Sequence, residues 1–329
     1  MRFHALALLS LAGSFTGCFV GGGTPPDAQR PDSASPVDRT EPPADSAAPE
    51  DATTTTDAPV AMDVTAQDTR ASTDTGVVRD VQVADVRSDT GAGSSDGGGC
   101  VGRLFCDDFE RGTAGSAPSA PWRVNTNMGT VTVSTTRARS GTRSVRVTTA
   151  SAAYKSAMMY IDGAPVFPVT GNVVFGRMMF YMDRAANDGV HWTMIEGRGP
   201  LESRMGVTSI YRYGGQHMQR LMSNYETSGA RTDCWDHSAT AIPQGRWACM
   251  EWRFDGPRNA MQFWLDGREL TDIATTMRGE GCIGHDLGDD WLAPRFQRMA
   301  VGWESYQMDD AREAFIDDVV FDDERIGCP

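Results

Sequence analysis

The segment WACMEWRFDGPRNAMQFWLDGREL, residues 247–270, decides the fold that this sequence predicts. Apolar residues alternate with other residues through its first half and again after residues 255–259. A period of two is that of a strand with two different faces. Asp-Gly pairs at 255–256 and 266–267 supply turn signals at the end of each run. The segment therefore predicts two antiparallel strands joined by a short turn.

The more polar face of this strand pair carries two tryptophans among charged side chains. Aromatic rings beside hydrogen-bonding groups on an open sheet fit the apolar face and the hydroxyl edge of a sugar ring. The candidate sugar-binding residues on this face are Trp247, Glu251, Arg253 and Trp264. The alternative is that the two tryptophans lie beneath a loop, and the pattern leaves both interpretations open.

The first residues, MRFHALALLSLAGSFTGC, combine a basic start with an apolar run and small residues. We interpret residues 1–17 as a secretory signal, since the run is too short to span a bilayer as a helix. Residues 14–18, SFTGC, resemble the lipobox of bacterial lipoproteins, which makes Cys18 the candidate lipidation site. We expect an exported lipoprotein held by this anchor in the outer membrane or at the cell surface.

Residues 18–99 predict a disordered acidic tether. No Leu, Ile, Phe, Tyr or Trp occurs between Phe19 and Leu104, so this stretch cannot bury enough apolar surface to offset the entropy of ordering. Residues 19–99 hold 15 Asp and Glu against 5 Arg, a charge of −10 out of the total of −14. A nucleic-acid-binding protein would show a basic stripe instead, and we expect none as a partner.

Residues 100–329 predict one all-β domain, a two-sheet antiparallel β-jelly-roll sandwich. Short alternating segments recur every 8–12 residues, separated by turn residues. The expected strands outside the central pair are residues 104–110, 122–124, 130–134, 144–148, 155–161, 173–182, 190–197, 205–213, 217–225, 296–303 and 314–322. Only residues 272–278 and 309–313 resemble short helical turns. We expect this domain to be a monomer.

Six cysteines follow Cys18, an even number that predicts three disulfides in an exported domain. They are Cys100, Cys106, Cys234, Cys249, Cys282 and Cys328. Six cysteines allow fifteen pairings, and we expect Cys234 to pair with Cys249 because closing that loop would contribute about 3 kcal/mol.

Several motifs together resemble the concanavalin A-like lectin/glucanase jelly rolls, and among them the fungal cellulose-induced proteins and glucuronan lyases. They are CDDFERG, ARSGTRSVRV, FGRMMFYM, WACMEWRFDG with FWLDGREL, and FIDDVVFDDERIGC. The resemblance implies a curved sandwich that takes a polysaccharide on one face, a structural calcium ion and, in the lyases, β-elimination of uronic-acid chains.

Acidic clusters near both ends of the domain are candidate calcium ligands, because calcium prefers hard oxygen donors. First and last strands are often neighbours in such a sandwich, which would bring the clusters together beside the SGTRS turn. The candidate ligands are Asp108, Glu110, Ser140, Asp317 and Asp318. The alternative is two solvated acidic edges.

Residues 190–225 are the part of the chain richest in groups that could support catalysis. Elimination from a uronate needs a base for the proton beside the carboxylate and a cation or amide that neutralises the carboxylate. The catalytic candidates are His191, Arg212, Gln216, His217 and Tyr225, together with Tyr306 from a later loop. Further substrate-binding candidates are Glu196, Arg204, Gln219 and Trp303.

We therefore predict a surface polysaccharide lyase, with a non-catalytic carbohydrate-binding domain as the alternative. Hydrolysis is the weaker enzyme hypothesis, because no ExDxxE-type run places two carboxylates on one strand.

Overall fold

In the computed structural model, which describes residues 100–329, the central segment forms the strand pair that its alternation predicts. Strands β11 (Ala248–Asp255) and β12 (Ala260–Leu265) are antiparallel, with Met250 opposite Leu265 and Asp255 opposite Ala260. The turn between them contains Asn259 at a φ of 48°. Asn tolerates this left-handed conformation better than most residues, which is why it suits the turn.

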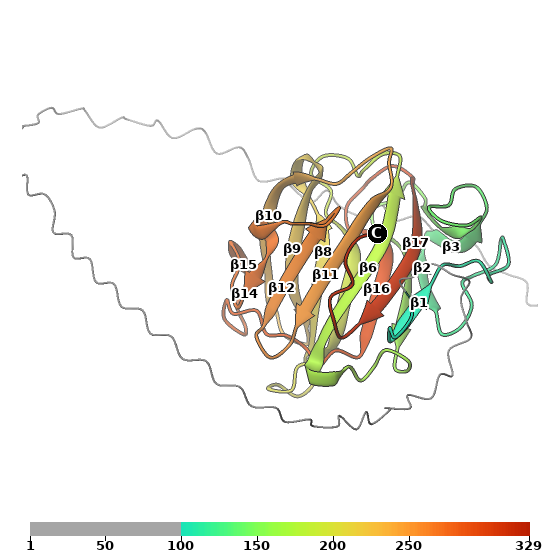
Figure 1. Cartoon of the computed structure of the whole chain (residues 1–329). Helices are drawn as coiled ribbons and strands as arrows, with labels where there is room; N and C mark the ends of the chain where they lie inside the picture. The colour runs from blue at the N-terminus through green and yellow to red at the C-terminus, as the bar shows by residue number, and fades with distance from the viewer. Residues whose placement is uncertain (1–99) are drawn as a thin grey trace, which may run out of the picture. The chain divides into compact units, whose positions relative to one another are not determined.

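Two antiparallel sheets pack face to face, as predicted for a jelly roll (Figure 1). Sheet A has the order β13-β12-β11-β6-β17-β4-β3, with β1 beside β17 and β14 beside β12. Its other strands are β1 (Phe105–Asp107), β3 (Gly129–Ser134), β4 (Ser144–Thr149), β6 (Val173–Met182), β13 (Arg268–Glu269), β14 (Thr275–Thr276) and β17 (Arg312–Asp322).

Sheet B has the order β15-β10-β9-β8-β7-β16-β5-β2. Its strands are β2 (Arg123–Asn127), β5 (Lys155–Asp162), β7 (Trp192–Pro200), β8 (Thr208–Gly215), β9 (Arg220–Ser228), β10 (Asp233–Ala241), β15 (Gly281–Ile283) and β16 (Arg298–Ser305). The helical segments of residues 100–329 are single 3₁₀ turns, η1 (Thr170–Asn172), η2 (His217–Gln219) and η3 (Thr271–Ile273). None of them is long enough to cross a membrane.

Aromatic side chains from both sheets fill the core. Tyr213 of sheet B lies parallel to Phe254 of sheet A, with ring centroids 5.7 Å apart, and both are buried. Trp252 is also fully buried, opposite Gly176 of β6. A Cβ at position 176 would lie 2.2 Å from the Trp252 ring, so only glycine leaves space for this tryptophan. Burying each such side chain contributes roughly 1.5–3 kcal/mol.

Several sequence expectations about elements are wrong. Residues 309–313 do not form a helical turn, and the last two belong to β17. Of residues 272–278 only the first two lie in the 3₁₀ turn η3, and residues 217–219, predicted as strand, form η2. Strand β10 was not predicted, because its sequence, DCWDHSATA, mixes polar residues into both faces and has no clear alternation. The predicted signal peptide, Cys18 and the tether lie outside the described residues.

The C-terminal segment covers the outer face of sheet A, where the chain end is seen in front of β11 and β6 (Figure 1). The buried carboxylate of Glu251 accepts hydrogen bonds from the backbone N–H groups of Ile326 at 3.0 Å and Gly327 at 2.8 Å. The guanidinium of Arg325 lies 4.4 Å from the ring centre of Trp264. The polar face of the central strand pair is therefore occupied by the protein's own chain.

The disulfides are Cys100–Cys106, Cys234–Cys282 and Cys249–Cys328. The expected Cys234–Cys249 pair is wrong. Cys234 points into the core from β10 of sheet B and pairs with the neighbouring edge strand β15. Cys249 belongs to β11 of sheet A and holds the C-terminal segment. The chain changes sheet between the two cysteines, and sequence spacing does not show this change.

Candidate functional site

The outer face of sheet B carries the polar groups that the sequence concentrates in residues 190–225. Tyr211, Tyr213 and Tyr225 point into the core. Because side chains alternate along a strand, Arg212 of β8 and Asn224 of β9, which are next to these tyrosines in sequence, point outward. Cross-strand pairing then places Glu196 of β7 beside Arg212 of β8, and Arg212 beside Asn224 of β9.

A buried ion-pair cluster lies at the centre of this face. The carboxylate of Glu196 accepts hydrogen bonds from Nε of Arg198 at 2.6 Å and Nε of Arg212 at 3.2 Å. Burial alone would raise the pKa of Glu196, but Arg212 and Arg198 hold it below its usual range. Arg212 also donates to Glu226 and, at 3.5 Å, to Asn224. Arg212 is thus a fixed cation, oriented by groups on both neighbouring strands.

A phenol lies beside this cation. The hydroxyl of Tyr306 and that of Thr193 are 2.9 Å apart, and the charge of Arg212 acts on the phenol. Burial raises the pKa of Tyr306 above its ordinary value, although Arg212 opposes the effect. The ring of Tyr154 lies 6.2 Å from that of Tyr306, and its hydroxyl donates to Glu304 at 2.7 Å. Tyr306 is therefore protonated near neutral pH and can donate a proton.

An imidazole is held next to this phenol by backbone contacts. The N–H of Tyr306 donates to the carbonyl oxygen of His191 at 3.1 Å, and the N–H of His191 donates to the side chain of Gln307 at 2.7 Å. Burial lowers the pKa of His191 below 6.5, and its hydrogen bond with Gln216 and the charge of Asp233 oppose this shift. His191 is consequently neutral near pH 7 and can accept a proton.

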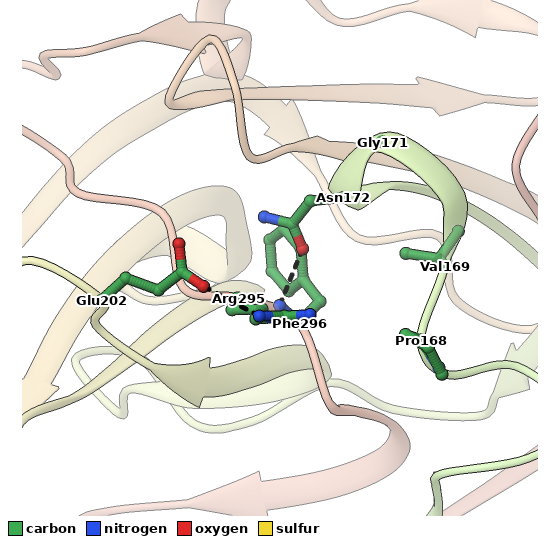
Figure 2. A pocket seen from close by; sticks show the side chains of 7 residues that line it. All are labelled: Pro168, Val169, Gly171, Asn172, Glu202, Arg295 and Phe296. Carbon is green, nitrogen blue, oxygen red and sulfur yellow. Dashed lines mark hydrogen bonds and ion pairs between the residues drawn. The ribbon is translucent and has the colours of Figure 1, made fainter.

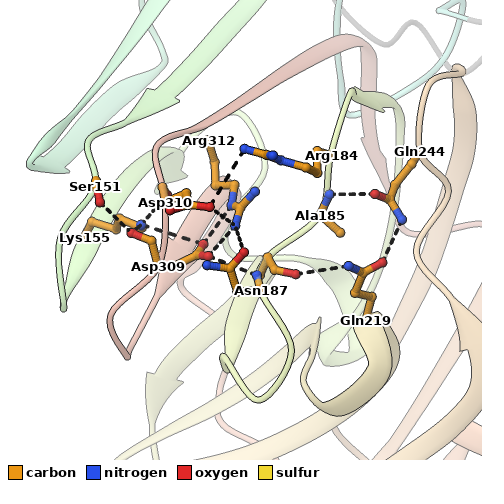
Figure 3. A network of polar contacts seen from close by, with 11 residues as sticks. Ser151, Lys155, Arg184, Ala185, Asn187, Gln219, Gln244, Asp309, Asp310 and Arg312 are labelled. Atoms are coloured by element: carbon orange, nitrogen blue, oxygen red, sulfur yellow. Dashed lines mark hydrogen bonds and ion pairs between the residues drawn. The ribbon is translucent and has the colours of Figure 1, made fainter.

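A buried network of polar contacts joins the loop before β7 to the loop before β17 (Figure 3). The ammonium of Lys155 donates to the carbonyl oxygens of Asp309 at 2.8 Å and Asp310 at 2.6 Å. The carboxylate of Asp309 accepts from Arg312 and from the backbone N–H of Asn187 at 2.9 Å. The side chains of Lys155, Asp309 and Arg312 are at most 2% exposed. This network ties the loop before β7 to the loop before β17.

Five of the sequence-predicted residues meet on the outer face of sheet B or at its border. They are His191, Glu196, Arg212, Gln216 and Tyr306. They come from β7, β8 and the segments at the ends of β7, β8 and β16. Arg212 bonds to both Glu196 and Asn224, and the amide of Asn224 also donates to Asp233 at 2.7 Å. A separate hydrogen bond joins His191 to Gln216.

Other predicted residues lie elsewhere. Tyr225 and Trp303 are buried in the core, where Trp303 stacks on Trp192 at 4.9 Å. His217 is 65% exposed and pairs with Asp188. Gln219 hydrogen bonds with Gln244 and Ala186, and Arg204 is exposed on the loop between β7 and β8. These five residues do not face the central cluster.

The predicted sugar-binding face of the central strand pair is in the other sheet. Glu251 and Trp264 are buried beneath the C-terminal segment, as described above. Arg253 donates to Gln262 at 2.9 Å and pairs with Asp255. Trp247 packs against Tyr181, with ring centroids 5.6 Å apart. The alternative interpretation placed the two tryptophans beneath a loop, and this is correct for Trp264, which the C-terminal segment covers.

Sequence reasoning missed Tyr154, Arg198 and Asp233 at this face. A signal was present for Arg198, which follows Glu196 by two residues and therefore shares its face. Tyr154 and Asp233 gave no such signal. Asp233 belongs to the unpredicted strand β10, and Tyr154 precedes β5, which is adjacent to β16 only in the folded sheet.

The predicted calcium ligands gather near residues 139–143 without forming an evident metal cluster. Glu110 accepts from the N–H groups of Thr142 and Arg143, and the hydroxyl of Ser140 donates to Asp318 at 2.6 Å. Asp317 accepts from the N–H of Arg139 and of Ser140. The side chain of Asp108 accepts from the N–H of Glu110 at 3.2 Å. Residues 100–329 contain no group of three or more His, Cys, Asp or Glu arranged to hold a metal ion.

The family description of the Cip1-like core domain, within the polysaccharide-lyase-like group, matches residues 108–324 of this chain. The chain belongs to this family. Among solved structures it is similar to the cellulose induced protein Cip1, with 21% identity and a TM-score of 0.51, covering 68% of this chain and 100% of that one.

It is also similar to the endo-β-1,4-glucuronan lyase of the fungus Trichoderma reesei, with 13% identity and a TM-score of 0.50, covering 68% of this chain and 98% of that one. Both similarities establish the shared jelly-roll fold. No curated protein matches the chain.

Proposed function

We propose that this Cip1-like domain cleaves uronic-acid polysaccharides by β-elimination on the outer face of sheet B. The observation that carries the proposal is the pairing of two groups in complementary protonation states. His191 is neutral because burial lowers its pKa, and the neighbouring Tyr306 is protonated because burial raises its pKa. Tyr306 lies beside the buried cation Arg212, and a backbone hydrogen bond makes His191 the neighbour of Tyr306. Membership of a polysaccharide-lyase-like family supports the same chemistry.

The reaction needs three actions, and each has a candidate residue. His191 takes the proton from the carbon next to the uronate carboxylate. The electron pair released there forms a carbon–carbon double bond as the bond to the glycosidic oxygen breaks, and Tyr306 donates its proton to that leaving oxygen. Arg212, with the amides of Asn224 and Gln216, stabilises the negative charge that develops on the carboxylate.

Hydrolysis by a carboxylate pair is less well supported by this geometry. Glu196 and Glu304 influence one another, and burial raises the pKa of Glu304 while that of Glu196 is lowered. A glycosidase does use two carboxylates with separated pKa values. However, Glu196 is 5% exposed and each of its oxygens already accepts a hydrogen bond from an arginine, so burial and this pairing disfavour its attack on a sugar or a water.

Removal of the acid and the base tests the proposal. We expect Tyr306→Phe and His191→Ala each to lower the rate of unsaturated product formation from polyglucuronate by about 100-fold or more, since general acid–base catalysis contributes on that order. His285→Ala is the matched control, because His285 is exposed and pairs with its neighbour Asp289 rather than with His191 or Tyr306. If both site variants keep the parent rate, His191 and Tyr306 do not perform these roles. If the parent binds the polymer without cleaving it, the non-catalytic carbohydrate-binding domain is the correct function.

We also propose a structural calcium ion beside residues 139–143. Glu110, Ser140 and Asp318 would hold it with oxygen atoms alone, the donors that calcium prefers. Asp108, which accepts from the N–H of Glu110, is a further candidate ligand. Asp317 supports the proposal, because burial and the adjacent charge of Asp318 raise its pKa to about 7. A bound cation would offset this accumulation of negative charge and stabilise the junction of the first and last strands.

Export and anchoring complete the proposed function. We propose that cleavage before Cys18 and its lipidation attach the chain to a membrane, and that residues 19–99 separate the domain from that membrane. Replacing Cys18 with Ser tests the anchor. We expect the variant to leave the detergent phase that retains the parent, and equal partitioning of the two would refute lipidation.

A further inference from the structure

A hollow of about 850 Å³ lies at the end of sheet B where β7 ends and β16 begins, whereas His191 and Tyr306 lie at the other end of these two strands. The residues that line it include a single carboxylate, that of Asp162, and four arginines: Arg123, Arg198, Arg295 and Arg298. Residues 100–329 as a whole carry a net charge of −5, so this concentration of arginine is not a general property of the surface. Arg198 connects the hollow to the centre, because its Nε donates to Glu196.

Two of these arginines are held in place while remaining accessible. Arg298 Nη2 and Arg123 Nη1 lie 3.1 Å and 3.0 Å from oxygens of Asp162. The guanidinium of Arg298 also stacks over Tyr160, 4.1 Å from the ring centre. The side chains of Arg123 and Arg298 are 63% and 33% exposed. One carboxylate therefore faces two guanidinium groups, each with five N–H donors, and leaves positive charge and donors for a ligand.

The chain segment before β16 forms another part of the lining of this hollow. The backbone N–H of Arg295 donates to Pro200 and that of Gln297 to Arg198, both at 3.0 Å, so the segment pairs with the end of β7. A Cβ at Gly199 would lie 1.8 Å from the carbonyl oxygen of Arg295, so this approach requires glycine. Asn172 holds the same segment by accepting from the N–H of Phe296 at 2.9 Å (Figure 2).

We propose that this hollow, the arginine subsite, binds the carboxylate of a uronic acid residue at a distance from the bond that is cleaved. The inference rests on the proposed function, because the sugar belongs to the same polysaccharide chain that His191 and Tyr306 process. A planar guanidinium recognises a carboxylate through two parallel hydrogen bonds, and the stacked Arg298 presents this fork already oriented. A neutral sugar has no negative charge to pair with these guanidinium groups. The subsite thus selects for chains that are acidic at more than one position.

The test measures binding by isothermal titration with the full chain carrying Tyr306→Phe, so that cleavage does not consume the ligand. The probes are an oligomer of β-1,4-linked glucuronic acid and the same oligomer with its carboxylates reduced to alcohols. We expect Arg298→Ala to weaken binding of the acidic oligomer about tenfold or more and to reduce its salt dependence. Arg123→Ala should act in the same direction. Arg298→Lys, which keeps the charge but loses the fork, should give an intermediate loss.

Arg146→Ala is the matched control, since Arg146 is an ion-paired surface arginine of sheet A. It should bind both probes as the parent does. The arginine subsite is refuted if Arg298→Ala and Arg123→Ala bind the acidic oligomer like the control, or if they lose the reduced oligomer equally. Cleavage by the parent is measured separately. If the parent cleaves the polymer and the arginines are not needed, only the subsite fails; if binding depends on them without cleavage, only the lyase function fails.

Discussion

At the scale of single residues, the proposed chemistry depends on the protonation of His191. A general base must be unprotonated, so activity should fall as the pH drops through the pKa of this imidazole. Burial places that pKa below 6.5. The hydrogen bond that the His191 imidazole donates to Gln216 favours the protonated form and raises the pKa, so its removal should lower the pKa further.

We therefore predict that the acid limb of kcat/KM lies below pH 6.5 in the parent and moves to lower pH in Gln216→Ala. The profile of kcat/KM reports the free enzyme, which is the state described here. His285→Ala should leave the limb where it is. A limb that stays unchanged in Gln216→Ala, or moves to higher pH, would contradict the assignment of His191 as the base.

Several candidate residues could be found from the sequence because the concentration of polar groups is a local property. The concentration of such groups in residues 190–225 identified Glu196 and Arg212, which do face outward together. It could not identify Tyr225 as a core residue, because polar side chains occur on both faces of β9. The prediction that Trp264 binds a sugar is wrong for another reason. Its face was assigned correctly, but a segment more than fifty residues later in the chain covers it.

At the scale of elements, the buried network of Lys155, Asp309 and Arg312 should control the loops beside the catalytic centre. We predict that Asp309→Asn lowers the free energy of unfolding by about 3 kcal/mol or more, because it leaves buried cations without their partner. Asp310→Asn is a close control, since Asp310 is 55% exposed and its ion pairs are 3.8–3.9 Å long. It should change stability by less than about 0.5 kcal/mol.

Urea unfolding of the two variants provides this comparison, with the lyase rate as a second readout. Burial would raise the pKa of Asp309, but Arg312 and its other hydrogen bonds lower it below 3.8. The stabilising contribution is then present above the pKa of the unfolded carboxyl group and is lost as the pH falls through the lower folded value. Equal stability of the two variants near pH 7 would show that the network is not a structural support.

The C-terminal segment supplies a second prediction about an element. The Cys249–Cys328 disulfide closes a sequence separation of 79 residues, for which the chain-entropy estimate is about 4.5 kcal/mol. We predict that Cys249→Ser combined with Cys328→Ser lowers stability by up to this amount and leaves the lyase rate unchanged below the melting temperature. The segment covers sheet A, whereas the proposed centre is on sheet B. A loss of activity in the folded variant would place part of the substrate site on sheet A.

The elements of this fold also differ in how far the sequence could predict them. Residues 173–182 were predicted as a strand and form β6 with these bounds, because eight of these ten residues are apolar, which is a strong local signal. The pairing of Cys249 with Cys328 was not predictable in the same way. It depends on where the last residues return to the sandwich, and no local pattern specifies that path.

At the scale of the whole molecule, the first and last strands of the domain lie side by side, with Phe105 opposite Phe321. The proposed calcium ion would connect these two ends of the domain. We predict that a chelator lowers the melting temperature of the parent and that added calcium restores it, since an ion bound only by the folded state stabilises it. Asp318→Asn should reduce the response to calcium. A melting temperature indifferent to both chelator and calcium would remove the ion from this account.

The central claim is that a Cip1-like jelly roll performs β-elimination on the face of sheet B that holds His191, Arg212 and Tyr306. Its most direct test is the chemical identity of the product released from polyglucuronate by the full chain. The account predicts new chain ends that carry a carbon–carbon double bond, detected by their ultraviolet absorbance and by a mass lower by one water than that of a hydrolysis product. Saturated ends, or no cleavage of a polymer that the protein binds, would contradict it.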